Sequence, residues 1–164
     1  MIDGTGRELL ADLGSGVRVE RAAAQDVPRI VELLRADQLG AGREQDPGDP
    51  RYLAAFDDIA GDPRQLLTVL VQHGSVIGTM QLTTVPGLSR LGSTRVIIEA
   101  VRVSETTRGQ GLGGRYLQWA IDRARTDGAA LVQLTTDRSR ADAHRFYERL
   151  GFEASHVGMK LRLR

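Results

Sequence analysis

The stretch VIIEAVRVSETTRGQGLGGRYLQWAIDRARTDG, residues 96–128, decides how this chain folds. Its first eight residues, 96–103, are rich in β-branched side chains and predict a strand. Four glycines follow within six positions, from Gly109 to Gly114. The next residues predict an amphipathic helix that ends at Gly128, because the apolar side chains recur at helical spacing. Those side chains are Leu117, Ala120, Ile121 and Ala124.

A second apolar run, residues 129–134, follows the helix and predicts another strand. A strand–helix–strand crossover of this length favours parallel pairing of the two strands. The rest of the chain supplies further elements. Strands are expected over 17–20, 66–71, 76–85 and 159–163. Helices are expected over 27–34 and 53–60. A last helix is expected to begin with a capping box at Ser139 and to end at Gly151. The expected fold is therefore one mixed α/β domain, with residues 1–16 as a flexible N-terminal extension.

Composition narrows the classes of function. The 164 residues include no cysteine, which excludes a disulfide scaffold, a thiol nucleophile and a cysteine-ligated metal. The formal net charge of +1 gives no reason to expect a nucleic-acid partner. The chain has no apolar run near the ~20 residues that cross a bilayer, and its start lacks a signal-peptide pattern. We therefore expect a cytoplasmic protein without a membrane partner, and three scattered histidines predict no metal site.

The glycine-rich loop predicts an anion site. Glycines allow a sharp turn, and the backbone N–H groups at the start of the following helix attract a phosphate or pyrophosphate. The plainer alternative is a turn that only links strand to helix. A dinucleotide fingerprint is disfavoured, because five residues separate the strand from Gly109 and because Asp137 comes later than a ribose-binding acid should.

Two motifs in this chain resemble the GNAT superfamily of N-acetyltransferases. Arg108, Gly111 and Gly113 match its acyl-CoA pattern Gln/Arg-x-x-Gly-x-Gly/Ala, and residues 143–152, AHRFYERLGF, match its A-x-x-F-Y-x-x-x-G-F helix. Within the superfamily, residues 142–147 are similar to the aminoalkylphosphonate N-acetyltransferases. One departure is Arg140, where family members often carry Asn, which puts an Asn contact to the cofactor arm in doubt.

The resemblance implies a GNAT-like acyltransferase domain over residues 17–164. Its sheet would be mostly antiparallel, with a central, splayed parallel pair and about four helices. The implied activity is transfer of an acetyl group from acetyl-CoA to a primary amine by direct attack, with a small-molecule acceptor and no metal. A homodimer stays open, as do a protein lysine or N-terminal acceptor and an acyl-CoA-binding module without turnover. The residues implied in cofactor binding are Val101, Arg102, Val103, Arg108, Gly109, Gln110, Gly111, Leu112, Gly113 and Gly114.

Amine acetylation needs a base for the amine, a donor to the oxyanion and an acid for the thiolate. We expect Glu99 to be the base, because it is a lone carboxylate in an apolar strand and strict alternation puts it on the same face as Val101. Tyr147 is the expected acid and the N–H of Val101 the oxyanion donor. The plainer alternatives are a structurally paired Glu99 and a Tyr147 that only packs, while His144 is expected to be a surface residue.

The acceptor is expected to bind among segments without motifs, namely 40–50, 86–93 and the turn around His156. Five charged side chains in the first two loops could line that side, although they also suit solvated loops. They are Arg43, Glu44, Asp46, Asp49 and Arg90.

Overall fold

The computed structural model of the chain describes residues 6–36, 40–107 and 109–163. Within them, six strands form one sheet whose spatial order follows the sequence. Neighbouring strands are antiparallel except for the last two, which are parallel from Arg95 opposite Leu131 to Ile98 opposite Leu134. The strands are β1 (Leu9–Gly14), β2 (Val17–Arg21), β3 (Gln65–Gln72), β4 (Ser75–Pro86), β5 (Thr94–Val103) and β6 (Leu131–Leu134).

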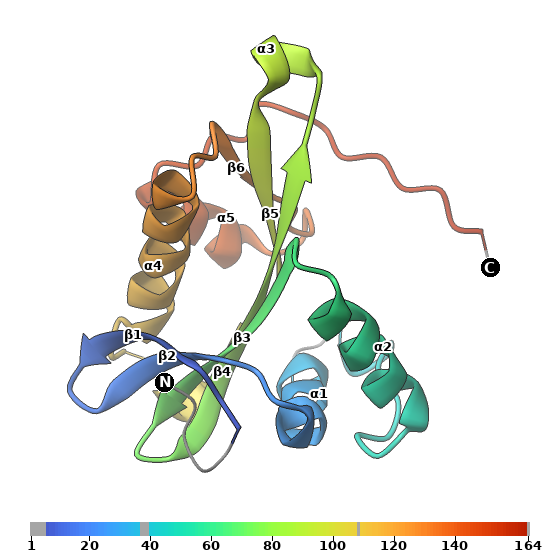
Figure 1. Ribbon diagram of the computed structural model, residues 1–164, viewed down its shortest axis with the longest axis vertical. Coiled ribbons are helices and arrows are strands. Elements are labelled where there is room, and N and C mark those ends of the chain that lie inside the picture. The colour runs from blue at the N-terminus through green and yellow to red at the C-terminus, as the bar shows by residue number, and fades with distance from the viewer. Residues whose placement is uncertain (1–5, 37–39, 108, 164) are drawn as a thin grey trace.

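Helices cover both faces of the sheet (Figure 1). α4 packs on one face, where its Leu117 and Ala120 join a core with Leu70 of β3 and Ile98 of β5. α1 and α2 pack on the other face, over a smaller core around Val69. The helices are α1 (Val27–Arg35), α2 (Pro50–Gly61), α3 (Ser89–Gly92), α4 (Leu112–Thr126) and α5 (Ala141–Arg149). None of these described helices is long and apolar enough to cross a membrane.

The predicted mixed α/β domain and the parallel crossover are confirmed, and three local expectations are corrected. Residues 9–14, expected in an N-terminal extension, form β1 and pair with β2. The capping box at Ser139 is absent, because the Ser139 hydroxyl bonds to Asp137 and Arg140 takes the N-cap position. The expected strand over 159–163 does not form, so β6 stands at the end of the strand order and the parallel pair is not central.

β5 contains a bulge that sequence alternation did not reveal. Gln81 of β4 lies opposite Glu99, whereas Thr79 lies opposite Arg102, so β5 advances three residues while β4 advances two. Ala100, in the middle of this step, has a φ of 54°. That left-handed conformation costs a non-glycine residue ~1–2 kcal/mol. The bulge therefore interrupts the β4–β5 ladder close to the end of the strand.

Replacing Ala100 with glycine should relieve this strain. We expect Ala100→Gly to raise the free energy of unfolding by ~1 kcal/mol, because glycine adopts positive φ without a Cβ clash. The matched control is Ala120→Gly, at a buried position in α4, which should lower the stability by ~1 kcal/mol or more. Urea unfolding measures both values. A loss of stability in Ala100→Gly would contradict the strain argument.

Candidate active site

The glycine-rich loop after β5, expected to bind an anion, turns at two glycines with positive φ angles. Gly109 and Gly111 have φ angles of 83° and 68°, which favour glycine over other residues. Gly111 is the N-cap of α4 in the left-handed conformation. The N–H groups of the first helical turn lack intrahelical acceptors and face this end of the helix. Arg108, expected to bind the cofactor, lies outside the described residues.

Gly113 brings the two sequence motifs together. A Cβ at this position would lie 3.8 Å from Cζ of Phe146 on α5 and 4.0 Å from Cγ2 of Val103 on β5. The glycine loop, the end of β5 and the A-x-x-F-Y helix therefore meet at one place. Phe146 packs against the core on the α4 side.

Other members of the expected cofactor set have partners of their own. The side chain of Leu112 is buried in the core, so it can offer only its backbone N–H to a ligand. The guanidinium of Arg102 donates to the carbonyl of Val101 at 2.7 Å. Arg115 follows this set in the sequence, at the start of α4, and its guanidinium donates to the Gly14 carbonyl in the β1–β2 turn at 3.5 Å. Arg115 therefore contacts the β1–β2 hairpin.

A cavity of about 1720 Å³ adjoins this region, between β5, β6, α5 and the segment 153–160. Glu99 is exposed and lines it. Among the described residues, its carboxylate has no hydrogen bond or ion pair, so the structurally paired alternative is not supported. A carboxylate in this position is available to accept a proton from a molecule in the cavity.

Tyr147 lines the same cavity from α5. Its ring packs edge-on against Phe146 and Phe152, with centroid separations of 5.3 and 5.9 Å. Burial raises the pKa of the phenol, and the charges of Arg140 and Arg102 oppose that rise. The phenol therefore holds its proton throughout the neutral pH range, as a proton donor must.

The bulge corrects the expected relation between Glu99 and Val101. Alternation places residues two apart on one face, but the extra residue at Ala100 shifts the pattern. Val101 and Val103 pack against the core that contains Ile98, whereas Glu99 faces the cavity. Val101 has no Cα partner on β4. The register of the two strands therefore assigns no hydrogen-bond acceptor on β4 to the backbone N–H of Val101.

The cavity is rich in cations, which sequence reasoning largely missed. Among the residues that the structure describes, eight arginine or lysine side chains and five carboxylates line it. Of the five loop residues considered for this side, Arg43, Glu44 and Arg90 do line the cavity. Asp49 instead caps α2, where hydrogen bonds from Arg51 lower its pKa to about 2. The cationic residues are Arg43, Arg90, Arg95, Arg102, Arg125, Arg138, Arg140 and Lys160.

Further polar groups reach the cavity. The hydroxyl of Thr136 is buried there without a hydrogen-bond partner among the described residues. His144 also lines it, and its Nε2 lies 2.9 Å from the backbone carbonyl of Asp137. Asp137 itself bonds to Ser139, which lowers the pKa of its carboxyl. A molecule bound in the cavity can therefore supply the hydrogen bond that the Thr136 hydroxyl lacks.

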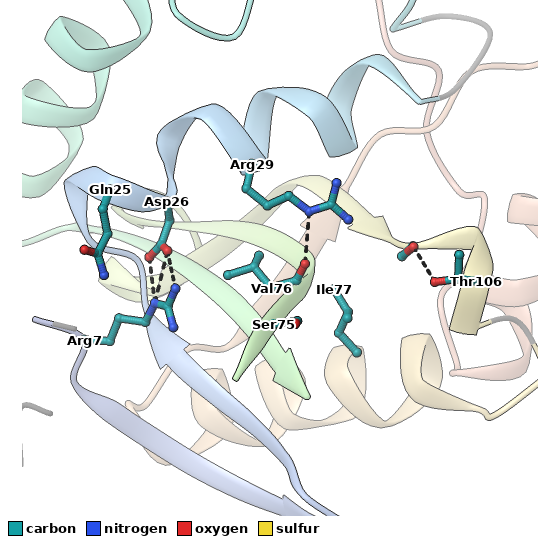
Figure 2. Close-up of a pocket in the computed structure, with 9 residues that line it drawn as sticks. Arg7, Gln25, Asp26, Arg29, Ser75, Val76, Ile77 and Thr106 are labelled. Carbon is teal, nitrogen blue, oxygen red and sulfur yellow. Dashed lines mark hydrogen bonds and ion pairs between the residues drawn. The ribbon is translucent and has the colours of Figure 1, made fainter. Parts of the chain in front are cut away.

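A second, smaller hollow lies beside α1, and its charged groups are engaged within the protein (Figure 2). Nε of Arg7 donates to the Asp26 carboxylate at 2.9 and 3.1 Å, and Arg7 also lies 3.6 Å from Glu20. Arg29 donates to the carbonyl of Val76 at 3.1 Å. These contacts fasten the N-terminal segment and α1 to the sheet. Within the described part of the chain, no cluster of His, Asp or Glu could hold a metal ion.

Comparison with known proteins identifies this arrangement. Residues 27–152 match the model of the acetyltransferase (GNAT) family. The chain belongs to the GNAT family. An aminoalkylphosphonate N-acetyltransferase of Salmonella typhimurium (strain LT2) is 38% identical over 108 residues, which are 64% of this chain and 70% of the relative. The chain is therefore an acetyltransferase, as the two motifs predicted.

Solved structures of relatives agree on the GNAT fold. A protein of Bacillus halodurans C-125, described as a transcriptional regulator, is 42% identical and superposes with a TM-score of 0.86, over 90% of this chain and 99% of the other. An acetyltransferase of Trypanosoma brucei is 27% identical, with a TM-score of 0.74 over 90% of this chain and 99% of the other.

Proposed function

We propose that this acetyltransferase moves the acetyl group of acetyl-CoA to the primary amine of a small molecule that carries an anionic group. The observation that carries the proposal is the cavity that Glu99 and Tyr147 both line, beside the end of β5 and the α5 motif. The cradle at Gly109 and Gly111 suits the pyrophosphate of coenzyme A. Backbone groups of Val101 and Val103 can pair with the amides of the pantetheine arm.

The reaction uses three groups of this chain in turn. Glu99 accepts the proton of the acceptor ammonium, directly or through water, so that a neutral amine attacks the thioester carbon. The N–H of Val101 donates to the oxygen on which negative charge develops. Tyr147 gives its proton to the departing thiolate as the C–S bond breaks, the new amide nitrogen releases its second proton, which restores the phenol, and Glu99 passes the first proton to water. No covalent enzyme intermediate is formed.

The cations of the cavity favour an acceptor with a negative charge. Arginine binds phosphonate and carboxylate groups through paired, charge-assisted hydrogen bonds. The Salmonella relative is named for aminoalkylphosphonates, which combine an amine with such a group. We therefore place the phosphonate among the arginines and the amine toward Glu99.

Ligand-induced stabilisation tests the cofactor assignment first. Acetyl-CoA at ~100 times its dissociation constant should stabilise the protein by ~2.7 kcal/mol, which thermal melting detects. Coenzyme A should act similarly, and NAD should have no effect. Stabilisation by NAD with none by acetyl-CoA would overturn the proposal.

The acceptor class is tested by thiol release with matched amines. We expect an aminoalkylphosphonate to react fastest, followed by the amino acid of the same carbon skeleton and then by the simple alkylamine. A lysine-containing peptide as the best acceptor would favour a protein acetyltransferase. Stabilisation by acetyl-CoA without thiol release from any amine would favour a binding module.

Gly113→Glu should abolish acetyl-CoA binding in a folded protein. The new carboxylate would lie between Val103 and Phe146, beside the pyrophosphate cradle, where it blocks and repels the ligand. Gly111→Glu should have the same effect with added backbone strain, because of its positive φ. Gly61→Glu, at the open end of α2, is the control and should bind normally. Equal coenzyme A affinity in all four proteins would contradict the cradle.

Arg140→Gln should selectively weaken the binding of an anionic acceptor. Loss of a charge-assisted hydrogen bond costs ~1.5–3 kcal/mol, so the KM for an aminoalkylphosphonate should rise ~10- to 100-fold. The KM for acetyl-CoA and for a neutral amine should change little. Arg145→Gln is the control, because Arg145 lies on the same helix outside the cavity and pairs with Asp142. An equal effect on neutral and anionic acceptors would remove Arg140 from phosphonate recognition.

A further inference from the structure

One face of β5 presents opposite charges to the large cavity. Val96 and Ile98 pack into the core on the α4 side. Alternation therefore places Arg95 and Glu99 on the other face of the sheet. Both side chains are exposed and line the cavity. Among the described residues, neither the guanidinium of Arg95 nor the carboxylate of Glu99 has a hydrogen bond or ion pair, so both are available to a ligand.

β6 continues this surface beside β5. Its Val132 and Leu134 pack against the core on the α4 side. Leu131 and Gln133 therefore lie on the opposite face, where both are exposed, and Leu131 is the ladder partner of Arg95. α1 and α2 lie toward the end of the sheet away from α3 and leave this part of the face open (Figure 1). A bound molecule can therefore lie along β5 with its carbon chain beside Leu131.

The cations of the cavity fall on both sides of Glu99 along the strand direction. Arg102 lies near the carboxyl end of β5, and Arg138 and Arg140 follow the carboxyl end of β6. Because the two strands are parallel, these three arginines lie toward the same end of the pair. Arg95 stands near the amino end of β5. The base of the proposed reaction therefore lies between two cationic regions.

The spacing along β5 sets the length of the ligand that fits. Four residues of extended strand separate the Cα atoms of Arg95 and Glu99 by ~13 Å. Strand side chains stand roughly perpendicular to the sheet, so their charged groups have a similar separation. One hydrogen bond of ~2.9 Å at each end leaves roughly 7 Å between the amine nitrogen of the ligand and its anionic oxygen. An amine and an anion that are joined by a chain of three atoms span about this distance.

We propose that Arg95 binds a second anionic group of the acceptor, a step that rests on the proposed function of the cavity. The amine lies at Glu99 and a first anionic group near Arg140. The second group, three chain atoms from the amine, pairs with Arg95 through charge-assisted hydrogen bonds. Amino acids with a terminal phosphonate or phosphate have this arrangement, because their carboxylate stands beside the amine and the second anion at the far end.

Steady-state thiol release with matched acceptors tests the second anion. 2-Aminoethylphosphonate carries one anionic group, whereas 2-amino-4-phosphonobutanoate carries a carboxylate beside the amine and a phosphonate three carbon atoms away. We expect the KM of the second compound to be ~10- to 100-fold lower, because a charge-assisted hydrogen bond contributes that much. 2-Amino-3-phosphonopropanoate, which is one carbon shorter, should lose most of this gain. O-Phosphoserine keeps the longer spacing with a phosphate in place of the phosphonate, so its KM shows which terminal group Arg95 prefers.

Variants of Arg95 show whether this residue makes the second contact. Arg95→Gln should raise the KM for 2-amino-4-phosphonobutanoate to that for 2-aminoethylphosphonate, and it should leave the KM for 2-aminoethylphosphonate and for acetyl-CoA unchanged. Arg95→Lys keeps the charge and should retain part of the preference. Arg123→Gln is the control, because Arg123 lies on α4 outside the cavity and pairs with Asp127 at 2.7 Å. It should change none of these values.

The outcomes distinguish a failure of the subsite from a failure of the proposed function. No thiol release with any of these aminophosphonates would overturn the proposed function and the subsite with it. Turnover of 2-aminoethylphosphonate with an equal KM for 2-amino-4-phosphonobutanoate would overturn the subsite alone. An Arg95→Gln variant that keeps the wild-type preference would do the same.

Discussion

Tyr147→Phe should lower kcat by ~10²–10⁴-fold and leave the affinity for acetyl-CoA almost unchanged. The substitution removes the proton that the departing thiolate needs, and general acid catalysis is worth this much. The phenylalanine ring keeps the edge-on contacts with Phe146 and Phe152, so the fold should be preserved. Steady-state thiol release gives kcat, and thermal melting with acetyl-CoA reports binding.

The pH dependence of kcat distinguishes a proton-donating Tyr147 from a Tyr147 that only packs. Burial raises the pKa of the Tyr147 phenol, so its proton is retained below the ordinary value of ~10 and is lost only above it. Wild-type kcat should therefore fall at alkaline pH only beyond ~10, and the phenylalanine variant should lack that fall.

The control for this variant is Tyr116→Phe. The hydroxyl of Tyr116 is buried in the main core and bonds to Thr68, far from solvent. Its loss should cost ~1 kcal/mol of stability with little effect on kcat. If Tyr147→Phe keeps more than a tenth of the wild-type kcat, Tyr147 serves in packing and the thiolate departs without an acid.

Most of the elements and the turn at the glycine-rich loop were predictable because local rules decide them. β-branched runs, helical spacing and the glycines at 109 and 111 express strand, helix and turn preferences directly. The bulge at Ala100 was not predictable, because alanine gives no signal of a positive φ. It arises from the pairing of β5 with β4, and it moves Val101 off the face of Glu99.

Most of the arginines in the cavity, where we propose that the acceptor binds, were missed for a related reason. Arginines such as Arg95, Arg125 and Arg138 come from separate elements and converge only in the folded chain. Each by itself has the sequence signature of a solvated residue. The strand expected over 159–163 does not form for a different reason. The alternating pattern is present in the sequence, but a strand also needs a neighbouring strand to pair with, and the pattern does not show whether one is in place.

Glu99→Gln should reduce turnover ~10²–10⁴-fold near and below neutral pH, with partial recovery as the pH rises. The amide keeps the shape of the side chain and removes its basicity. An alkyl ammonium has a pKa of ~10.4, so each unit of pH below that value leaves about tenfold less neutral amine. At high pH the amine is already neutral and the missing base matters less. Rates of thiol release from pH 6 to about 10 measure this recovery.

Glu148→Gln is the matched control. Glu148 directly follows Tyr147 in the sequence and, like Glu99, is a carboxylate residue that lines the cavity. If negative charge in the cavity were all that the amine requires, both variants would weaken the reaction equally and neither would recover with pH. If Glu99 is the base, only its variant shows a loss that shrinks as the amine deprotonates in solution. A loss below tenfold at neutral pH, or one that is constant with pH, would assign proton removal to water or another group.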